Sequence, residues 1–321
     1  MIRLLIDRDI PFIKGIFEPY AEVIYLNGRE MDCAKVKDAD ALIIRTRTRC
    51  NKALLSGSNV RAIATATIGY DHIDTDWCQT AGIKVMSAPG CNSEGVMRYF
   101  YTALHNLAKN KSLDLTGKCI GVIGVGNVGK KVVEMGQRLG FEMLLNDPPR
   151  ERLEGSTIFT PLDELLSKSD IVTLHIPLDA GNRNFANADF FGKMKDNAIF
   201  VNASRGEVVD EYALLSNVGR FGGIVLDVWR NEPVINTELL NVADIATPHI
   251  AGYSKAGKIN ATVSVVRGIA HFFDIAPLKD FAITYQEDPF DLDSYDIMAD
   301  DKALRAAPET FERLRQNYAY R

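Results

Sequence analysis

The sequence lacks long apolar runs and is poor in cysteine, and each shortage excludes a class of protein. No window approaches the roughly 18 uninterrupted apolar residues of a transmembrane helix, and charges interrupt the N-terminus where a signal peptide needs an apolar stretch. The five cysteines form no CxxC pair and have no histidine nearby at metal-binding spacing. We therefore expect a soluble, cytoplasmic protein with no disulfide framework, no metal site and no membrane contact.

The sequence also has no excess of basic charge. Its 321 residues carry a formal net charge of −5, whereas a protein that coats nucleic acid needs a broad positive field. Hydrophobic residues make up 46% and charged residues 25%, which are ordinary values for a globular protein. The length suggests about two domains, and we expect no nucleic acid among the partners.

Short β-rich runs recur along the chain, separated by helix-like stretches. The first group comprises residues 2–6, 22–25, 40–44, 60–65 and 83–86, and the second comprises 119–125, 142–146, 170–174, 198–202, 223–227 and 243–247. Helical patterns cover 93–109 and 258–273, whereas the acidic stretch 287–301 has little periodicity. Strands that alternate with helices predict an α/β fold with two doubly wound parallel sheets.

A glycine-rich segment opens the second group. Gly124, Gly126 and Gly129 have GxGxxG spacing between an apolar run and a helical pattern. The first glycine permits a tight turn, the second lets a pyrophosphate approach, and the third lets helix and strand pack closely. Amides near Asn127 and Val128 would then face the phosphates at the helix N-terminus. The alternative is a glycine-rich turn that binds nothing.

A carboxylate ends the next strand of that group. Asp147 lies 18 positions after Gly129, where an acidic residue would accept hydrogen bonds from the adenosine ribose. Its charge repels a 2′-phosphate, so we expect NAD rather than NADP, although Arg150 is close in sequence. The alternative is a turn-forming aspartate before two prolines.

Three later residues could handle protons and orient a substrate. Arg205, Glu232 and His249 each follow a predicted strand, and ligands bind at the carboxyl ends of parallel strands. Histidine suits proton transfer at neutral pH, a carboxylate fixes its tautomer, and arginine captures a carboxylate in a bidentate fashion. Each residue alone could be structural, and His72 and His175 remain alternatives for the histidine.

Arginine and threonine alternate in 45-RTRTR-49, directly after the apolar run 41–44. If the strand continued, Arg45, Arg47 and Arg49 would share one face and could bind an anion. The alternative is a solvated strand end that binds nothing.

Four segments, taken together, resemble one known family. The sequences GVIGVGNVG, NASRGEVVDEYALL, LDVWRNEP and TPHIAGYS follow one another as in the D-isomer-specific 2-hydroxyacid dehydrogenases. The resemblance implies a Rossmann cofactor domain at 95–254 inserted in a flavodoxin-like substrate domain at 1–94 and 255–283. Residues 284–321 would form a separate C-terminal segment, a shortened dimerisation region of a homodimer.

The resemblance also implies roles for individual residues. Arg205 would orient the substrate, His249 would act as acid and base, and Glu232 would hold the histidine. The residues that would meet NAD are Gly124, Gly126, Asn127, Val128, Gly129, Asp147, Ala203, Ser204, Arg205, Asp227 and Gly252. The residues that would meet the substrate are Arg45, Thr46, Thr67 and Tyr253.

The segments 64-ATATIGYDHID-74 and 88-APGCNS-93 most resemble family members whose substrate carries a phosphate besides its carboxylate. We therefore interpret Arg45 and Thr46 as part of a phosphate site, assisted by Arg47 or Arg49. The alternatives are a dehydrogenase for 3-phosphoglycerate or for an unphosphorylated 2-hydroxy acid, and a non-catalytic NAD sensor on the same fold. The chain departs from the family pattern at Tyr70, Arg98, Ile176 and Arg230.

Overall fold

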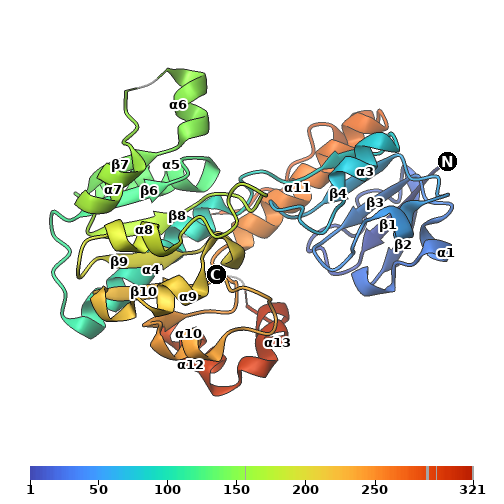
Figure 1. The fold of residues 1–321 in the computed structure, drawn as a ribbon. Coiled ribbons are helices and arrows are strands. Elements are labelled where there is room, and N and C mark those ends of the chain that lie inside the picture. Colours follow the sequence, from blue (N-terminus) through green and yellow to red (C-terminus); the bar gives the residue numbers. More distant parts are fainter. Residues whose placement is uncertain (156, 287–288, 294, 320–321) are drawn as a thin grey trace. The chain divides into compact units, whose positions relative to one another are not determined.

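The computed structural model describes residues 1–155, 157–286, 289–293 and 295–319. The chain forms two compact units, Met1–Asn92 with Ser254–Asp288 and Ser93–Tyr253 with Pro289–Arg321. Each unit is built on its own parallel sheet (Figure 1). The predicted α/β fold with two parallel sheets is confirmed. Within the described residues, no helix is both long and apolar enough to cross a membrane.

The first unit has a five-stranded sheet in the order β2-β1-β3-β4-β5, the flavodoxin-like order. Its strands are β1 (Ile2–Asp7), β2 (Ala21–Leu26), β3 (Ala41–Ile44), β4 (Ala62–Thr65) and β5 (Lys84–Met86). Its helices are α1 (Cys33–Val36), α2 (Lys52–Leu55), α3 (Thr75–Thr80) and α11 (Lys255–Phe272).

Successive side chains of β1 point to opposite faces of that sheet and contribute to the core on each face. Leu4 and Ile6 join the core that contains Ile269 of α11, whereas Leu5 joins the core that contains Leu55 of α2. A parallel sheet covered on both faces requires apolar residues at consecutive positions, which explains the unbroken runs in the sequence.

The second unit has a six-stranded sheet in the order β11-β10-β9-β8-β6-β7. Its strands are β6 (Cys119–Ile123), β7 (Glu142–Asn146), β8 (Ile171–Leu174), β9 (Ile199–Asn202), β10 (Gly223–Leu226) and β11 (Ile245–Ala246). Its helices up to β11 are α4 (Ser93–Lys111), α5 (Asn127–Arg138), α6 (Pro148–Glu154), α7 (Leu162–Lys168), α8 (Ala188–Lys193), α9 (Glu211–Leu215) and α10 (Thr237–Val242). Short 3₁₀ turns are η1 (Gly28–Glu30) and η4 (Ala276–Leu278) in the first unit, and η2 (Gly206–Val208), η3 (Val218–Arg220) and η5 (Pro308–Thr310) in the second.

The C-terminal residues differ from the expectation of a separate segment, because they pack with the second unit. Helix α12 (Ile297–Ala306) begins inside the stretch that had no clear periodicity, of which residues 287, 288 and 294 lie outside the description, and α13 (Phe311–Gln316) follows. Asp301 of α12 accepts a hydrogen bond from the Ala246 amide at 2.7 Å, and Arg305 donates to the Ala243 carbonyl at 2.7 Å. Charged residues thus attach α12 to the β11 edge alongside the buried Ile297 and Leu304. A buried aspartate between these two apolar residues weakens the helical hydrophobic pattern in the sequence.

Candidate active site

The GxGxxG segment forms the turn between β6 and α5. Gly124 adopts a φ of +86°, a left-handed conformation that favours glycine. A Cβ on Gly129 would stand 2.1 Å from the Gly124 carbonyl oxygen, so helix and strand can approach this closely only without a side chain. Helix α5 has Gly126 as its N-cap and no side-chain cap, which leaves its first amides available to an anion.

A substitution at Gly126 can test cofactor binding without disturbing the packing of the protein. Its φ is −78°, and within the described residues a Cβ there would meet nothing within 4 Å. We expect Gly126→Ala to fold with an unchanged melting temperature but to bind NAD at least about tenfold more weakly, because its methyl group occupies the space a pyrophosphate needs. Gly219→Ala, which is equally open, is the control. Equal NAD affinity in both variants, measured by calorimetry, would remove the loop from the cofactor site.

Asp147 follows β7 and caps α6. Its Oδ2 accepts from the Val125 amide at 2.8 Å and its Oδ1 from the Arg150 amide at 3.1 Å. The Arg150 guanidinium donates to both oxygens of Glu154 and to the Val125 carbonyl oxygen. Arg150 is therefore engaged within the protein and is not arranged as a partner for a 2′-phosphate, which favours NAD.

Arg205 follows β9 on a turn that Asn202 holds. The buried Asn202 amide group donates to the Arg205 carbonyl oxygen at 2.9 Å and accepts from the Ser204 amide at 3.0 Å. The Arg205 Nη1 donates to the Ser204 carbonyl oxygen at 2.8 Å. Ala203 belongs to the same turn and is half-buried, so these predicted residues do lie together.

Glu232 and His249 form the central pair. His249 Nδ1 and Glu232 Oε2 are 2.8 Å apart, and Glu232 Oε1 accepts from the Trp229 amide at 3.0 Å. Burial raises the pKa of Glu232, but the charge and hydrogen bond of His249, the charge of Arg315 and the Trp229 amide together lower it below its usual value. The carboxylate is therefore ionised and accepts the proton on Nδ1, so Nε2 of neutral His249 carries the lone pair.

Asp227 supports the turn that carries His249. Its side chain is buried and accepts hydrogen bonds from the Thr247 hydroxyl at 2.6 Å, the Ile250 amide at 2.8 Å and the Ala251 amide at 2.9 Å. Burial raises the pKa of Asp227, although the His249 charge and these donors lower it. His249 itself adopts a φ of +56°. Asp227, expected to meet the cofactor, thus lies beneath the histidine turn, while Gly252 follows that turn half-buried.

The two alternative histidines have other settings. Desolvation lowers the pKa of His175 to about 3, so it stays neutral at physiological pH and does not exchange protons there. His72 Nε2 lies 3.1 Å from the Thr65 hydroxyl, which lies 2.7 Å from that of Thr67. His72 therefore belongs to a hydroxyl network in the first unit.

The prediction that residues 45–49 continue the strand is wrong. Strand β3 ends at Ile44, and the Thr48 amide donates to the Arg45 carbonyl oxygen at 3.3 Å in a turn. Both ladders of β3 end here, because it pairs with β1 as far as Ile43 and with β4 as far as Ile44. The buried Thr48 hydroxyl instead donates to the Gly28 carbonyl oxygen at 3.0 Å.

The turn separates the three arginines. Arg45 donates to the Asp9 carbonyl oxygen at 2.8 Å, Arg47 pairs with the Asp9 carboxylate at 3.0 Å, and Arg49 is exposed. Burial raises the pKa of Asp7, which ends β1, against the opposing effects of the Asp9 amide and the arginine charges. Two arginines therefore lie near the carboxyl ends of β1 and β3, the switch point of this sheet, where ligands bind in open α/β folds.

The other predicted substrate residues lie on different units. Thr46 is exposed in the same turn, and Thr67 follows β4 and donates to the Gly69 carbonyl oxygen at 2.8 Å. Tyr253 belongs to the second unit, where its ring packs edge-on against Tyr318 at 6.0 Å between centroids. Arg45, Thr46 and Thr67 thus gather at one end of the first sheet, and Tyr253 follows the His249 turn.

The profile of the D-isomer specific 2-hydroxyacid dehydrogenase, NAD binding domain, matches residues 97–251. The whole chain aligns at 44% identity with an erythronate-4-phosphate dehydrogenase of Bacteroides fragilis and covers 97% of that protein. The chain belongs to the D-isomer specific 2-hydroxyacid dehydrogenases. Within that family it groups with the erythronate-4-phosphate dehydrogenases, and one from Escherichia coli O157:H7 is 37% identical with 92% of its length covered.

Solved structures agree with that assignment. D-lactate dehydrogenase from Aquifex aeolicus, complexed with NAD and lactic acid, superposes with a TM-score of 0.74 at 26% identity, covering 89% of this chain and 100% of that one. The NAD⁺-bound 3-phosphoglycerate dehydrogenase of Entamoeba histolytica gives 0.74 at 25% identity, covering 89% and 99%. The prediction of an NAD-dependent dehydrogenase of this family is confirmed.

Three of the four departures from the family pattern lie on the second unit. Arg98 pairs with Glu94 at 3.2 Å. Arg230 donates to Asn184 and to the Val209 carbonyl oxygen, so it is tied away from Glu232. Ile176 is half-buried after β8. The fourth, Tyr70, is exposed on the first unit.

Sequence reasoning missed Arg315. Its Nη1 lies 3.7 Å from Glu232 Oε2, on the carboxylate oxygen that His249 contacts. The family resemblance resumes only weakly in 308-PETFERLRQNY-318, which contains Arg315, and it implied no role for this residue.

Proposed function

We propose that this protein oxidises 4-phospho-D-erythronate to 2-oxo-3-hydroxy-4-phosphobutanoate with NAD, in the biosynthesis of pyridoxal 5′-phosphate. The observation that carries the proposal is the pair of His249 and Glu232, 2.8 Å apart, in a chain that aligns over its full length with erythronate-4-phosphate dehydrogenases. The substrate is thus a small phosphorylated 2-hydroxy acid.

His249 acts as the base. Its Nε2 takes the proton of the C2 hydroxyl group, while the Glu232 carboxylate stabilises the imidazolium that forms. In the reverse direction the imidazolium returns that proton to the carbonyl oxygen. NAD, when bound, supplies the hydride acceptor for the hydrogen on C2. The lost hydride and the transferred proton together account for the oxidation of alcohol to ketone.

Arg205 orients the substrate. A guanidinium binds a carboxylate through two parallel hydrogen bonds and polarises the adjacent carbonyl group. The Asn202 contacts fix the turn on which Arg205 stands, so the main chain at this position is already organised before substrate binds. Thr67 and Tyr253 complete the substrate contacts that the family resemblance implies.

The cofactor site consists of the loop from Gly124 to Gly129 and the ribose acceptor Asp147. The open space at Gly126 and the uncapped amides of α5 fit a pyrophosphate. Ala203, Ser204, Arg205 and Gly252 would line the remainder of the site, and Asp227 would act beneath them through the His249 turn.

Arg45 and Thr46 bind the substrate phosphate, assisted by Arg47. Arg45 follows β3 beside the β1 end, at the switch point of the first sheet. Its guanidinium is held by one carbonyl oxygen at 2.8 Å, and its remaining N–H groups suit the oxygens of a phosphate. Arg49 is exposed, whereas Arg47 is partly buried beside Asp9, so Arg47 is assigned the assisting role.

Single-turnover absorbance tests the reaction. NAD-loaded protein is mixed with 4-phospho-D-erythronate, 3-phosphoglycerate or erythronate, and NADH is followed without an added acceptor, so that slow product release does not limit the signal. A fast signal with 4-phospho-D-erythronate alone is expected. A signal with 3-phosphoglycerate instead would keep the mechanism and replace the substrate. Silence with all three, despite bound NAD, would favour a non-catalytic NAD sensor.

We place the enzyme in the cytoplasm as a homodimer. Four of the five cysteines are buried and all five are free, which suits a reducing compartment. Light scattering should report the mass of two 35.6 kDa chains, and the mass of one chain at micromolar concentration would refute the dimer.

A further inference from the structure

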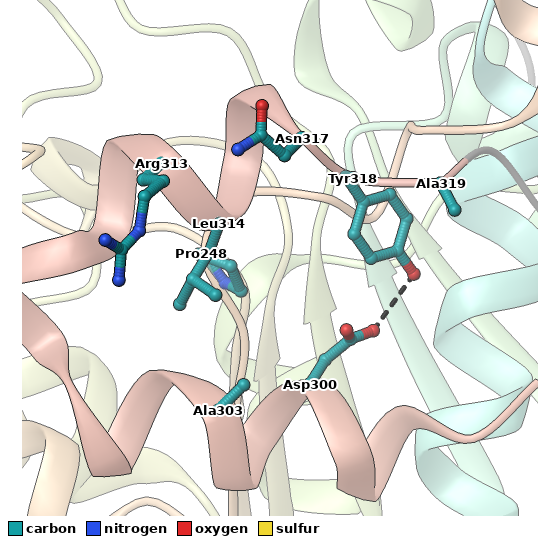
Figure 2. Close-up of a pocket in the computed structure, with 8 residues that line it drawn as sticks. All are labelled: Pro248, Asp300, Ala303, Arg313, Leu314, Asn317, Tyr318 and Ala319. Atoms are coloured by element: carbon teal, nitrogen blue, oxygen red, sulfur yellow. Dashed lines mark hydrogen bonds between the residues drawn. The ribbon is translucent and has the colours of Figure 1, made fainter.

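The C-terminal segment, residues 289–293 and 295–319, reaches the central pair of the active site through Arg315. Figure 2 shows Leu314, Asn317 and Tyr318 of this segment around a cavity with Pro248, the residue before His249. Tyr318 donates to Asp300 of α12 at 2.9 Å, which fixes the end of the segment to the helix below it. The segment is thus part of the wall beside the histidine turn.

Arg315 of α13 places a positive charge beside Glu232, the carboxylate that pairs with His249. Its side chain is 19% exposed, and its Nη1 lies 3.7 Å from Glu232 Oε2. It also interacts with Tyr253, so one guanidinium contacts both a predicted substrate residue and the carboxylate that holds His249. Glu232 therefore lies between two cationic groups when His249 is protonated.

If Arg315 had only a structural role, its position would lower the stability of the folded protein. Within the described residues, the buried Nε of Arg315 has no hydrogen-bond partner. Burying a guanidinium with an unpaired donor disfavours folding, and an apolar side chain would fill the same space without that loss. A partly buried cation with an unpaired donor beside a functional carboxylate is more readily explained by its effect on that carboxylate.

Resting on the function proposed above, we infer that Arg315 is a positioning residue that sets the pH range in which His249 exchanges protons. Its positive charge offsets part of the charge of Glu232, so the carboxylate favours the imidazolium less strongly than it would alone. Arg315 therefore weakens the hold of Glu232 on a second proton at the imidazole, the group that acts as the base for oxidation. The other groups that act on this pair, in the described part of the chain, are Asp227 beneath His249, and Tyr253 and Glu312 beside Arg315.

The test is the pH dependence of kcat/KM in both directions. In Arg315→Ala the imidazolium form of His249 is favoured. For oxidation, the pH at which kcat/KM falls on the acid side should therefore rise by about one unit. For reduction, the pH at which kcat/KM falls on the alkaline side should rise by the same amount. On the acid side of the limb, oxidation should fall by up to about tenfold, and it should recover in alkaline buffer. Arg315→Lys should restore most of the wild-type profile, because lysine keeps the charge.

Two further variants keep the inference falsifiable. Glu232→Gln removes the negative charge and should move both limbs in the opposite direction, to lower pH. Arg313→Ala, on the same helix but exposed and beside the cavity, should leave the limbs unmoved. A uniform loss of rate in Arg315→Ala without displaced limbs would reduce Arg315 to a structural role. Inactive wild-type protein would instead defeat the proposed function itself.

Discussion

Replacing His249 by asparagine is expected to lower kcat for 4-phospho-D-erythronate by about 10²–10⁴-fold, the usual contribution of a general base. Asparagine is the appropriate substitute because residue 249 has a φ of +56°, and asparagine tolerates that backbone conformation better than alanine. The hydrogen bonds from the Ile250 and Ala251 amides to Asp227 are then preserved.

The binding of NADH separates a lost base from a damaged protein. The His249→Asn variant should bind NADH with wild-type affinity, measured by fluorescence titration, because the glycine loop is remote in sequence and built on β6 and α5. His271→Asn, an exposed histidine in α11, is the matched control and should keep full activity. Turnover within tenfold of wild type in His249→Asn would remove His249 from the mechanism.

Replacing Arg45 by alanine should collapse the preference for the phosphorylated substrate. Each charge-assisted hydrogen bond contributes about 1.5–3 kcal/mol, so losing two should lower the kcat/KM ratio of phosphorylated to unphosphorylated erythronate by roughly two to four powers of ten. Activity on unphosphorylated erythronate should change little, because that substrate has no group for Arg45 to bind.

Arg49→Ala is the control for this experiment, because Arg49 belongs to the same run but is exposed beyond the turn. It should leave the ratio of the two kcat/KM values within about twofold of wild type. An Arg45→Ala variant that loses activity equally on both substrates would show that Arg45 supports the turn through Asp9 and does not read the phosphate.

Local patterns predicted most of the fold. The apolar runs between turn-rich stretches match all eleven strands of the two sheets, and the helical patterns match α4 and α11. Such patterns work because a strand buried on both faces needs consecutive apolar residues and a covering helix needs an apolar stripe. The pattern failed at α12, where the buried Asp301 lies between the two buried apolar residues Ile297 and Leu304 and, with Arg305, bonds the β11 edge.

Local patterns also failed where a strand loses its partner. Nothing in 45-RTRTR-49 distinguishes a strand from a turn, because alternation of charged and hydroxyl residues suits both. The ends of the neighbouring ladders decided the outcome, since β3 pairs with β1 only as far as Ile43 and with β4 only as far as Ile44. The same turn brings Arg45 and Arg47 to Asp9 and leaves Arg49 in solvent.

The sequence by itself determined the family, the α/β class, the glycine loop and the three residues at strand ends that the mechanism uses. These features are encoded locally, in residues adjacent in the chain. Only the tertiary structure decided that Asp227 supports the His249 turn and that Arg315 stands behind Glu232. These pairings join residues distant in sequence, and they depend on how helices pack against a sheet edge, which no local pattern specifies.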